Sequence, residues 1–163
     1  MNIFFTDRNP VTAARNLCNK HVIKMILEVA QLLCAAHIMT ESKLRPEEDI
    51  KFYKLTHGNH PCSIWARSSL RNYDWLSEHG MSLCDEYTFR YGKEHATQKL
   101  MWWLYTHAPN IAGVDFTNPP LCMPDIYKTD DPVESYRNYY RLDKMKNIEC
   151  IWTRREQPLW ITQ

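Results

Sequence analysis

The stretch that decides the fold is VTAARNLCNKHVIKMILEVAQLLCAAH, which spans residues 11–37. Its apolar residues recur at the helical interval, at positions 11, 14, 18, 22, 25, 26, 29, 32, 33 and 36. Asn9-Pro10 stands directly before it and is typical of a helix N-cap followed by proline at the first helical position. The pattern predicts one long helix from about 11 to 37 with a buried face.

A second long helix is expected over residues 61–91. His60-Pro61 suits its start and Gly92 suits its C-cap, while Gly80 in its interior is expected to mark a bend. Shorter helices are predicted over 95–106 and 132–146, with a polar connection at 38–58 and an irregular proline-rich loop at 108–130. The predicted fold is all-α: one compact domain, residues 1–163, framed by two long antiparallel-type helices.

Composition narrows the class of protein. Hydrophobic residues make up 44% of the 163 residues and charged residues 24%, which fits neither a disordered chain nor a membrane protein. No apolar run reaches the roughly 18 residues of a membrane span, and no signal peptide is recognisable, so a cytoplasmic protein is expected. The net charge of +1 argues against DNA binding that depends mainly on neutralising phosphates, without excluding it.

The six cysteines are widely spaced and form no Cys-x-x-Cys pair. Several stand in apolar helical surroundings, where a thiol behaves as a small hydrophobic group in a reducing compartment. We therefore expect Cys18, Cys34 and Cys84 to be buried and reduced, and no disulfide framework.

The first predicted helix carries a candidate acid–base and anion-binding set. His21, Lys24 and Glu28 fall in one column beside the buried stripe, with Lys20 flanking it. A carboxylate beside two cations at the margin of an apolar face can serve acid–base chemistry. The alternative is an ordinary solvated face with an i, i+4 pair between Lys24 and Glu28.

A second candidate is His57-Gly58-Asn59-His60-Pro61-Cys62, directly before the second long helix. Exposed amides at a helix N-terminus with two imidazoles beside them suit a phosphate, so His57, Asn59 and His60 are candidate phosphate-binding residues. A structural turn with capping histidines is the alternative. A metal set of His57, His60 and Cys62 matches no common zinc spacing, so no metal and no cofactor are expected.

The C-terminal tail mixes aromatic and basic residues. Arg154 and Arg155 are candidate phosphate-binding residues, and Trp152 and Trp160 could stack on bases. Burial of the tryptophans against the helical core is the alternative.

Three patches resemble the phage pyrimidine-dimer DNA glycosylases of the endonuclease V type. Asn19-Lys20-His21 followed by Glu28 is similar to the first helix of that family, and residues 54–65, KLTHGNHPCSIW, are similar to its glycine- and histidine-containing turn. Arg154-Arg155 through Trp160 resembles its basic, aromatic tail. The resemblance implies a compact all-α fold and a DNA-repair glycosylase that is also a lyase.

In that family the α-amine of the chain attacks the sugar C1′ of a damaged or modified pyrimidine, displaces the base and leaves an imine, after which β-elimination cuts the strand. The resemblance makes Glu28 the essential carboxylate. A bulky second residue, Asn2, usually keeps the initiator methionine, so the expected nucleophile is the amine of Met1. An α-amine with a pKa of about 7.7–8.0 is partly neutral near pH 7 and suits this attack.

Two other functions fit the same residues. An enzyme acting on a free nucleotide or modified base would use His21, Lys24 and Glu28, with the turn at 57–60 as its phosphate cradle. A helical binding module without chemistry would use the surplus of aromatic residues as its interface. The expected partner is DNA or a nucleotide, and no membrane.

Overall fold

The region predicted as one helix over 11–37 forms two helices in the computed structural model, which describes residues 1–162. α1 spans Pro10–Asn16 and α2 spans Asn19–Met39, and Leu17 between them is extended, with φ −76° and ψ 140°. Side chains from distant segments form hydrogen bonds with the backbone carbonyl groups that lose their helical partners at this break. Trp152 donates its indole N–H to the carbonyl of Asn16 at 3.0 Å, and Arg90 donates to that of Leu17 at 2.8 Å. The helical periodicity was correctly predicted, and the break depends on these tertiary partners.

The second predicted helix is also divided. α3 spans Pro61–Ser68 and α4 spans Leu70–Tyr91, because Ser69 adopts an extended conformation, with φ −150° and ψ 144°. The hydroxyl of Ser69 caps α4 by accepting from the N–H of Arg71, and the N–H of Leu70 donates to the carbonyl of Gly113 at 2.7 Å. The loop carbonyl thus replaces a helical bond at the break.

α4 continues through Gly80 without a break. The absence of a side chain there permits close packing. A Cβ atom on Gly80 would lie 2.2 Å from Cε of Met101 and 2.8 Å from Cγ1 of Val29. Gly80 therefore lets α2, α4 and α5 approach one another.

The remaining elements are short. They are α5 (Gln98–Thr106), the 3₁₀ turn η1 (Asp125–Tyr127), α6 (Pro132–Tyr139), the π turn η2 (Tyr140–Lys144), α7 (Met145–Asn147) and the 3₁₀ turn η3 (Leu159–Ile161). The loop that joins α5 to α6 is irregular apart from η1, as its prolines predicted. Residues 1–162 contain no strand, so the all-α prediction is confirmed.

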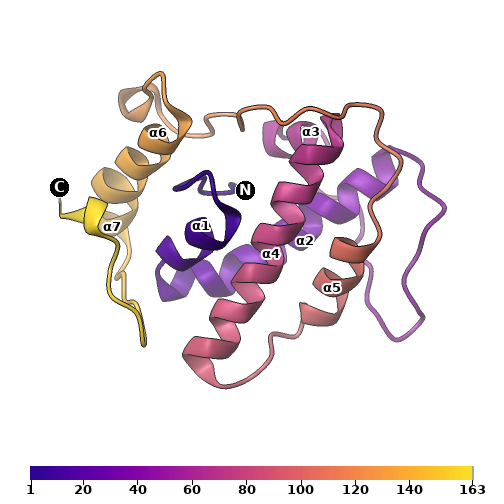
Figure 1. Cartoon of the computed structure of the whole chain (residues 1–163), viewed down its shortest axis with the longest axis horizontal. Coiled ribbons are helices and arrows are strands. Elements are labelled where there is room, and N and C mark those ends of the chain that lie inside the picture. Colours follow the sequence, from indigo (N-terminus) through magenta and orange to yellow (C-terminus); the bar gives the residue numbers. More distant parts are fainter. Residues whose placement is uncertain (163) are drawn as a thin grey trace.

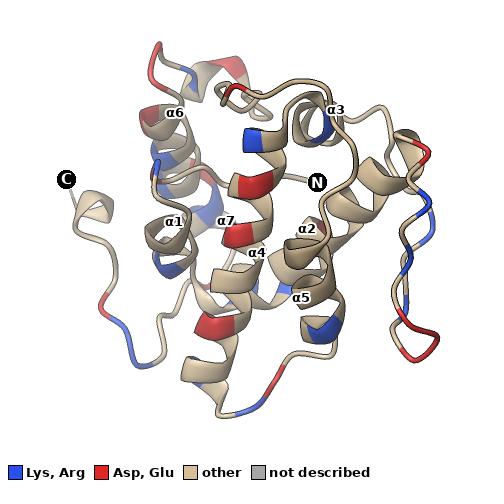
Figure 2. Cartoon of the chain, turned by 45° about the vertical axis from the view of Figure 1, so that its right-hand side comes forward, with Lys and Arg blue, Asp and Glu red and all other residues tan. Residues whose placement is uncertain are grey.

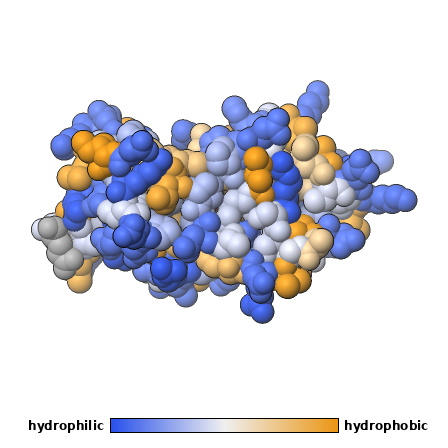
Figure 3. Space-filling view, turned by 90° about the horizontal axis from the view of Figure 1, so that it is seen from above, coloured by the Kyte–Doolittle hydropathy of each residue, from blue (hydrophilic) through white to orange (hydrophobic). Residues whose placement is uncertain are grey.

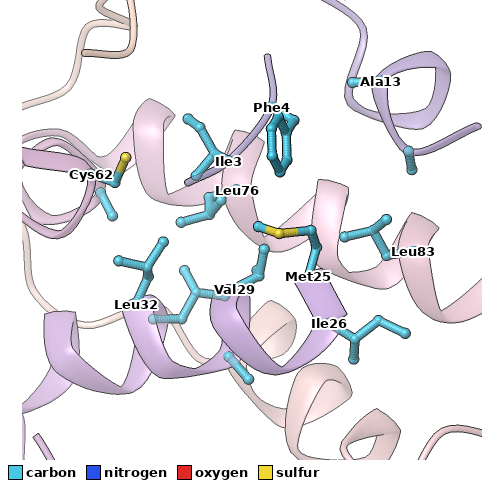
Figure 4. Packing of buried hydrophobic residues seen from close by; sticks show 14 of the residues in the cluster. Ile3, Phe4, Ala13, Met25, Ile26, Val29, Leu32, Cys62, Leu76 and Leu83 are labelled. Carbon is cyan, nitrogen blue, oxygen red and sulfur yellow. The ribbon is translucent and has the colours of Figure 1, made fainter. Parts of the chain in front are cut away.

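The two long helices frame the molecule (Figure 1). α2 runs toward the upper right and α4 returns toward the lower left, while α6 and α7 lie at the side of α1. Val29 and Leu32 of α2 face Leu76 of α4, and Ile3 of the N-terminal segment packs above them (Figure 4). The first residues of the chain therefore belong to the core and are fixed in place by it.

α2 is long and apolar enough to cross a membrane by length and composition alone, and 61% of the relevant window is buried within the structure. This burial explains its apolar character, because α2 is the central helix of the core. Cys18, Cys34 and Cys84 are buried and free, as predicted.

The 20 basic residues of the chain are nearly balanced by 19 acidic ones. The connection between α2 and α3 carries both basic and acidic residues (Figure 2). Seen from above, hydrophobic side chains lie in separate patches among hydrophilic ones (Figure 3). A nucleic-acid contact would therefore depend on a few well-placed cations.

Candidate active site

A pocket of about 300 Å³ opens where the N-terminal segment crosses α2. Its volume lies at the lower end of the range for small-ligand clefts. Four segments line it: the N-terminus, α2, the loop before α6 and the end of the last helical region. The lining residues are Met1, Asn2, Phe4, His21, Lys24, Met25, Glu28, Cys122, Tyr139, Lys144 and Ile148. His21, Lys24 and Glu28, which share one helical column in the sequence, thus line one pocket.

Glu28 is the carboxylate of this pocket, with a side chain that is 12% exposed. Its Oε2 accepts a hydrogen bond from the backbone N–H of Asn2 at 3.2 Å. Its Oε1 lies 3.1 Å from Nζ of Lys24, one helical turn earlier and 67% exposed. The carboxylate is therefore held between the N-terminal backbone and an exposed surface cation.

The N-terminal segment is fixed by Asn2 and Phe4. The side-chain amide of Asn2 donates to the carbonyl of Cys122 at 2.9 Å, and its Oδ1 accepts from the N–H of Ile3 at 2.7 Å. Phe4 has φ +46°, and its carbonyl accepts from the N–H of Thr6 at 2.7 Å in a tight turn. A bulky residue in this left-handed region is strained, so the surrounding packing determines the path of the chain.

His21 forms the inner wall of the pocket and is buried, which places it inside the apolar stripe rather than beside it. Its Nδ1 lies 2.7 Å from the hydroxyl oxygen of Tyr140, which also accepts the N–H of Cys18 at 2.9 Å. The hydroxyl keeps its own proton for donation, and when it donates to Nδ1 the ring proton lies on Nε2. Burial, followed by the charges of Lys144 and Lys24, lowers the pKa of His21 to about 4, so its ring is neutral at pH 7.

Lys144 is a second cation of the pocket that the sequence interpretation missed. It ends the π turn η2, and its Nζ lies 4.4 Å from the ring centroid of Tyr139. A π turn holds an extra residue and redirects the side chains that follow, which is a common feature of functional sites. The sequence around Lys144 gave no sign of this turn, because it reads as a regular helix end.

The turn before α3 adjoins the same site. Nδ1 of His60 caps α3 by accepting the N–H of Cys62 at 3.2 Å. Burial and the N-terminal ammonium lower the pKa of His60, and the carboxylate of Glu28 opposes them, so these charges act on one imidazole.

Cys62 lies 3.6 Å, sulfur to sulfur, from Cys122 of the pocket wall, and their hydrogen bond lowers the pKa of Cys122 and raises that of Cys62. Sequence spacing could not pair these two thiols, which are 60 residues apart.

The other predicted residues do not line this pocket. Lys20, His57, Asn59 and Arg154 are exposed, and Arg154 donates to the carbonyl of Phe89 at 3.0 Å. Trp160 packs at 6.0 Å, centroid to centroid, from Tyr140, and the Arg137 guanidinium lies over its ring.

Arg155 borders a different pocket and is bound to Glu86 of α4. Its Nε donates to Oε1 of Glu86 at 3.1 Å. The same carboxylate, 5% exposed, accepts from Nε of Arg90 at 3.0 Å. Arg155 therefore fastens the C-terminal tail to α4.

A family profile described as pyrimidine dimer DNA glycosylase matches residues 1–99. The match includes the N-terminal segment, α2, the turn at 57–60 and α4, and ends before Cys122 and Lys144. Comparison with curated proteins and with solved structures gave no match.

Proposed function

The chain belongs to the pyrimidine dimer DNA glycosylase family, and from this premise we propose that it excises damaged pyrimidines from DNA through an imine formed with its N-terminal amine. One observation carries the proposal: Met1 and Glu28 line the same pocket, and the N–H of the second residue is bonded to the Glu28 carboxylate. This brings an amine and a half-buried carboxylate to one small cleft.

In the proposed reaction the neutral α-amine of Met1 attacks C1′ of the damaged nucleotide. The bond from C1′ to the base breaks, and the base leaves with the electron pair and takes up a proton. Opening of the sugar ring then leaves a protonated imine between Met1 and C1′. Loss of a proton from C2′ expels the 3′ phosphate, which cuts the strand by β-elimination.

Glu28 is proposed to stabilise the positive charge that develops on the sugar and then on the imine. A carboxylate that is mostly removed from water interacts strongly with such a charge. The neutral His21 is proposed to direct its Nε2–H into the cleft as a hydrogen-bond donor while Tyr140 holds the ring. In this role His21 does not exchange a proton near pH 7, because burial lowers its pKa to about 4.

The phosphates next to the lesion are proposed to contact Lys24 and Lys144, the two cations that line the pocket. Lys20, His57, Asn59, His60 and Arg154 remain candidates for contacts further along the DNA backbone. The salt dependence of DNA binding grows with the number of phosphates that such cations contact, so each cation of this set should add its own share to it. Stacking by Trp160 and phosphate binding by Arg155 would first require these side chains to leave Arg137 and Glu86.

A duplex oligonucleotide with one cyclobutane pyrimidine dimer tests this function. We expect cleavage of the damaged strand at the dimer, with no cleavage of the same duplex without damage. Free pyrimidine nucleotides in excess should not compete. If free nucleotides abolish DNA binding and the dimer is left intact, the chain is instead an enzyme that acts on free nucleotides. If neither DNA nor nucleotide binds, the helical binding module replaces it.

A further inference from the structure

We propose that His60, Cys62 and Cys122 bind one thiophilic divalent cation of the zinc class beside the N-terminal amine. One imidazole nitrogen and the two sulfur atoms all lie within 4.8 Å of one another. The sequence spacing of His57, His60 and Cys62 matched no common zinc arrangement and led us to expect no metal. In the structure His57 is exposed, and Cys122 from a distant loop takes its place in the set.

The distance between the two sulfur atoms fits a tetrahedral centre. Zinc binds thiolate sulfur at about 2.3 Å and imidazole nitrogen at about 2.0 Å, so two sulfurs on one zinc lie about 3.8 Å apart. The sulfurs of Cys62 and Cys122 are 3.6 Å apart, so they need almost no movement. Cys62 is fully buried, while His60 and Cys122 are half-buried, so the site has a rigid base and an accessible side.

The ligands are held by contacts from outside the set. The N–H of Cys62 donates to Nδ1 of His60 at 3.2 Å, which orients the ring. The carbonyl of Cys122 accepts from the amide of Asn2 at 2.9 Å, and the Tyr136 hydroxyl anchors the same loop by donating to the carbonyl of Pro120 at 2.7 Å. Such surrounding hydrogen bonds fix ligand orientation in metal sites.

Three protein ligands leave a fourth position on the metal. Met1 and Cys122 line the same pocket, so the amine of Met1 is the group of this chain that we propose to compete for this position. An amine bound to the metal has no free electron pair for attack at C1′. This consequence rests on the proposed function, whereas the metal site itself does not.

Zinc binding to the reduced full-length chain tests the site without DNA. After treatment with a chelator, the chain is titrated with Zn²⁺ in competition with a chromophoric chelator, and with Co²⁺ to detect thiolate-to-metal charge-transfer absorption. We expect one ion per chain and that absorption band. Loss of a group that only orients a metal ligand weakens metal binding by at least about 10-fold. Cys122→Ser removes a ligand itself, so it should weaken Zn²⁺ binding by at least that factor.

Two further variants make the result specific. His60→Asn retains a side-chain oxygen that can cap α3 and removes the imidazole, so it should stay folded and also bind Zn²⁺ more weakly. Cys150→Ser removes a thiol of similar exposure outside the set and should bind Zn²⁺ as the unaltered chain does. Thermal unfolding confirms that each variant is folded.

The site is overturned if the unaltered chain binds no stoichiometric Zn²⁺, or if Cys122→Ser and Cys150→Ser bind it equally. A Cys62–Cys122 disulfide in a chain that binds no zinc would also overturn it. If Zn²⁺ binds but the chain never cleaves damaged DNA, the metal site stands and the proposed function fails.

Discussion

The backbone N–H of Asn2 lies 3.2 Å from Oε2 of Glu28 and donates a hydrogen bond to it across 26 residues of sequence. Consecutive Cα atoms are about 3.8 Å apart. Because Met1 directly precedes the hydrogen-bonded residue, this bond also keeps the amine of Met1 near the carboxylate. A nucleophile on a chain terminus would normally be poorly ordered. Here the packing of Ile3 and Phe5, both fully buried, holds the terminus over the pocket.

Glu28→Gln tests the role of the carboxylate charge. The substitution retains the size of the side chain and an oxygen that can accept from Asn2, and it removes the negative charge that is proposed to stabilise the cationic intermediate. We expect the rate of dimer cleavage to fall by at least about 100-fold with DNA affinity nearly unchanged. Glu94→Gln, at an exposed position, serves as the control and should retain full activity. A Glu28→Gln enzyme that cleaves at the normal rate would remove Glu28 from the mechanism.

Lys24→Ala tests phosphate binding at the pocket. Lys24 is 67% exposed and free to leave Glu28 for a phosphate. Loss of one contact should weaken DNA binding and reduce the slope of log affinity against log salt by about 0.9. The exposed Lys93, changed to Ala, should leave the slope unaltered. An unchanged slope for Lys24→Ala would place the phosphate contacts elsewhere.

His37 makes stability depend on pH. It is buried between the hydroxyls of Ser42 and Tyr73, and burial lowers its pKa to about 4, compared with about 6.5 in the unfolded chain. Between these values the unfolded state binds a proton that the folded state does not. The contribution of His37 to the free energy of unfolding should therefore be complete above pH 6.5. It should decrease as the pH falls toward 4.

Urea unfolding at a series of pH values measures this effect. His37→Gln should flatten the pH dependence by at most about 1.4 kcal/mol per pH unit. His57→Gln, at an exposed position, should leave the dependence unchanged. Identical pH profiles for His37→Gln and the unaltered chain would show that His37 titrates normally.

Glu86→Ala should destabilise the fold. Arg90, with a fully buried side chain, would lose its carboxylate partner, and an unpaired buried charge costs about 3–5 kcal/mol. Arg155→Ala should cost less, because Arg155 is 31% exposed and Glu86 retains Arg90. Chemical unfolding followed by tryptophan fluorescence measures both changes. A stable Glu86→Ala chain would contradict the anchoring role of this cluster.

Helical periodicity was sufficient to predict the all-α fold and most of the helical content. It failed at Leu17 and Ser69, where the chain leaves the helix because partners distant in sequence take up its backbone groups. Local sequence does not encode such partners. The same limitation applies to Gly80, whose missing side chain serves contacts between helices.

For the site, the spacing of His21, Lys24 and Glu28 predicted a shared face, and the structure places all three at one pocket. Spacing could not predict that His21 is buried, nor that Cys122 and Lys144 join from distant segments. The basic tail was interpreted by composition alone, which could not show that Arg155 is bound to Glu86.

Borohydride trapping shows whether an imine forms between Met1 and DNA. Sodium borohydride added during reaction with dimer-containing or abasic duplex DNA reduces an imine to a stable amine. The account predicts a covalent adduct of one chain and one DNA strand, with the DNA attached to the peptide that contains Met1. A chain acetylated at its N-terminus should give no adduct. Cleavage of the dimer without any trapped adduct, or an adduct on a lysine peptide, would contradict it.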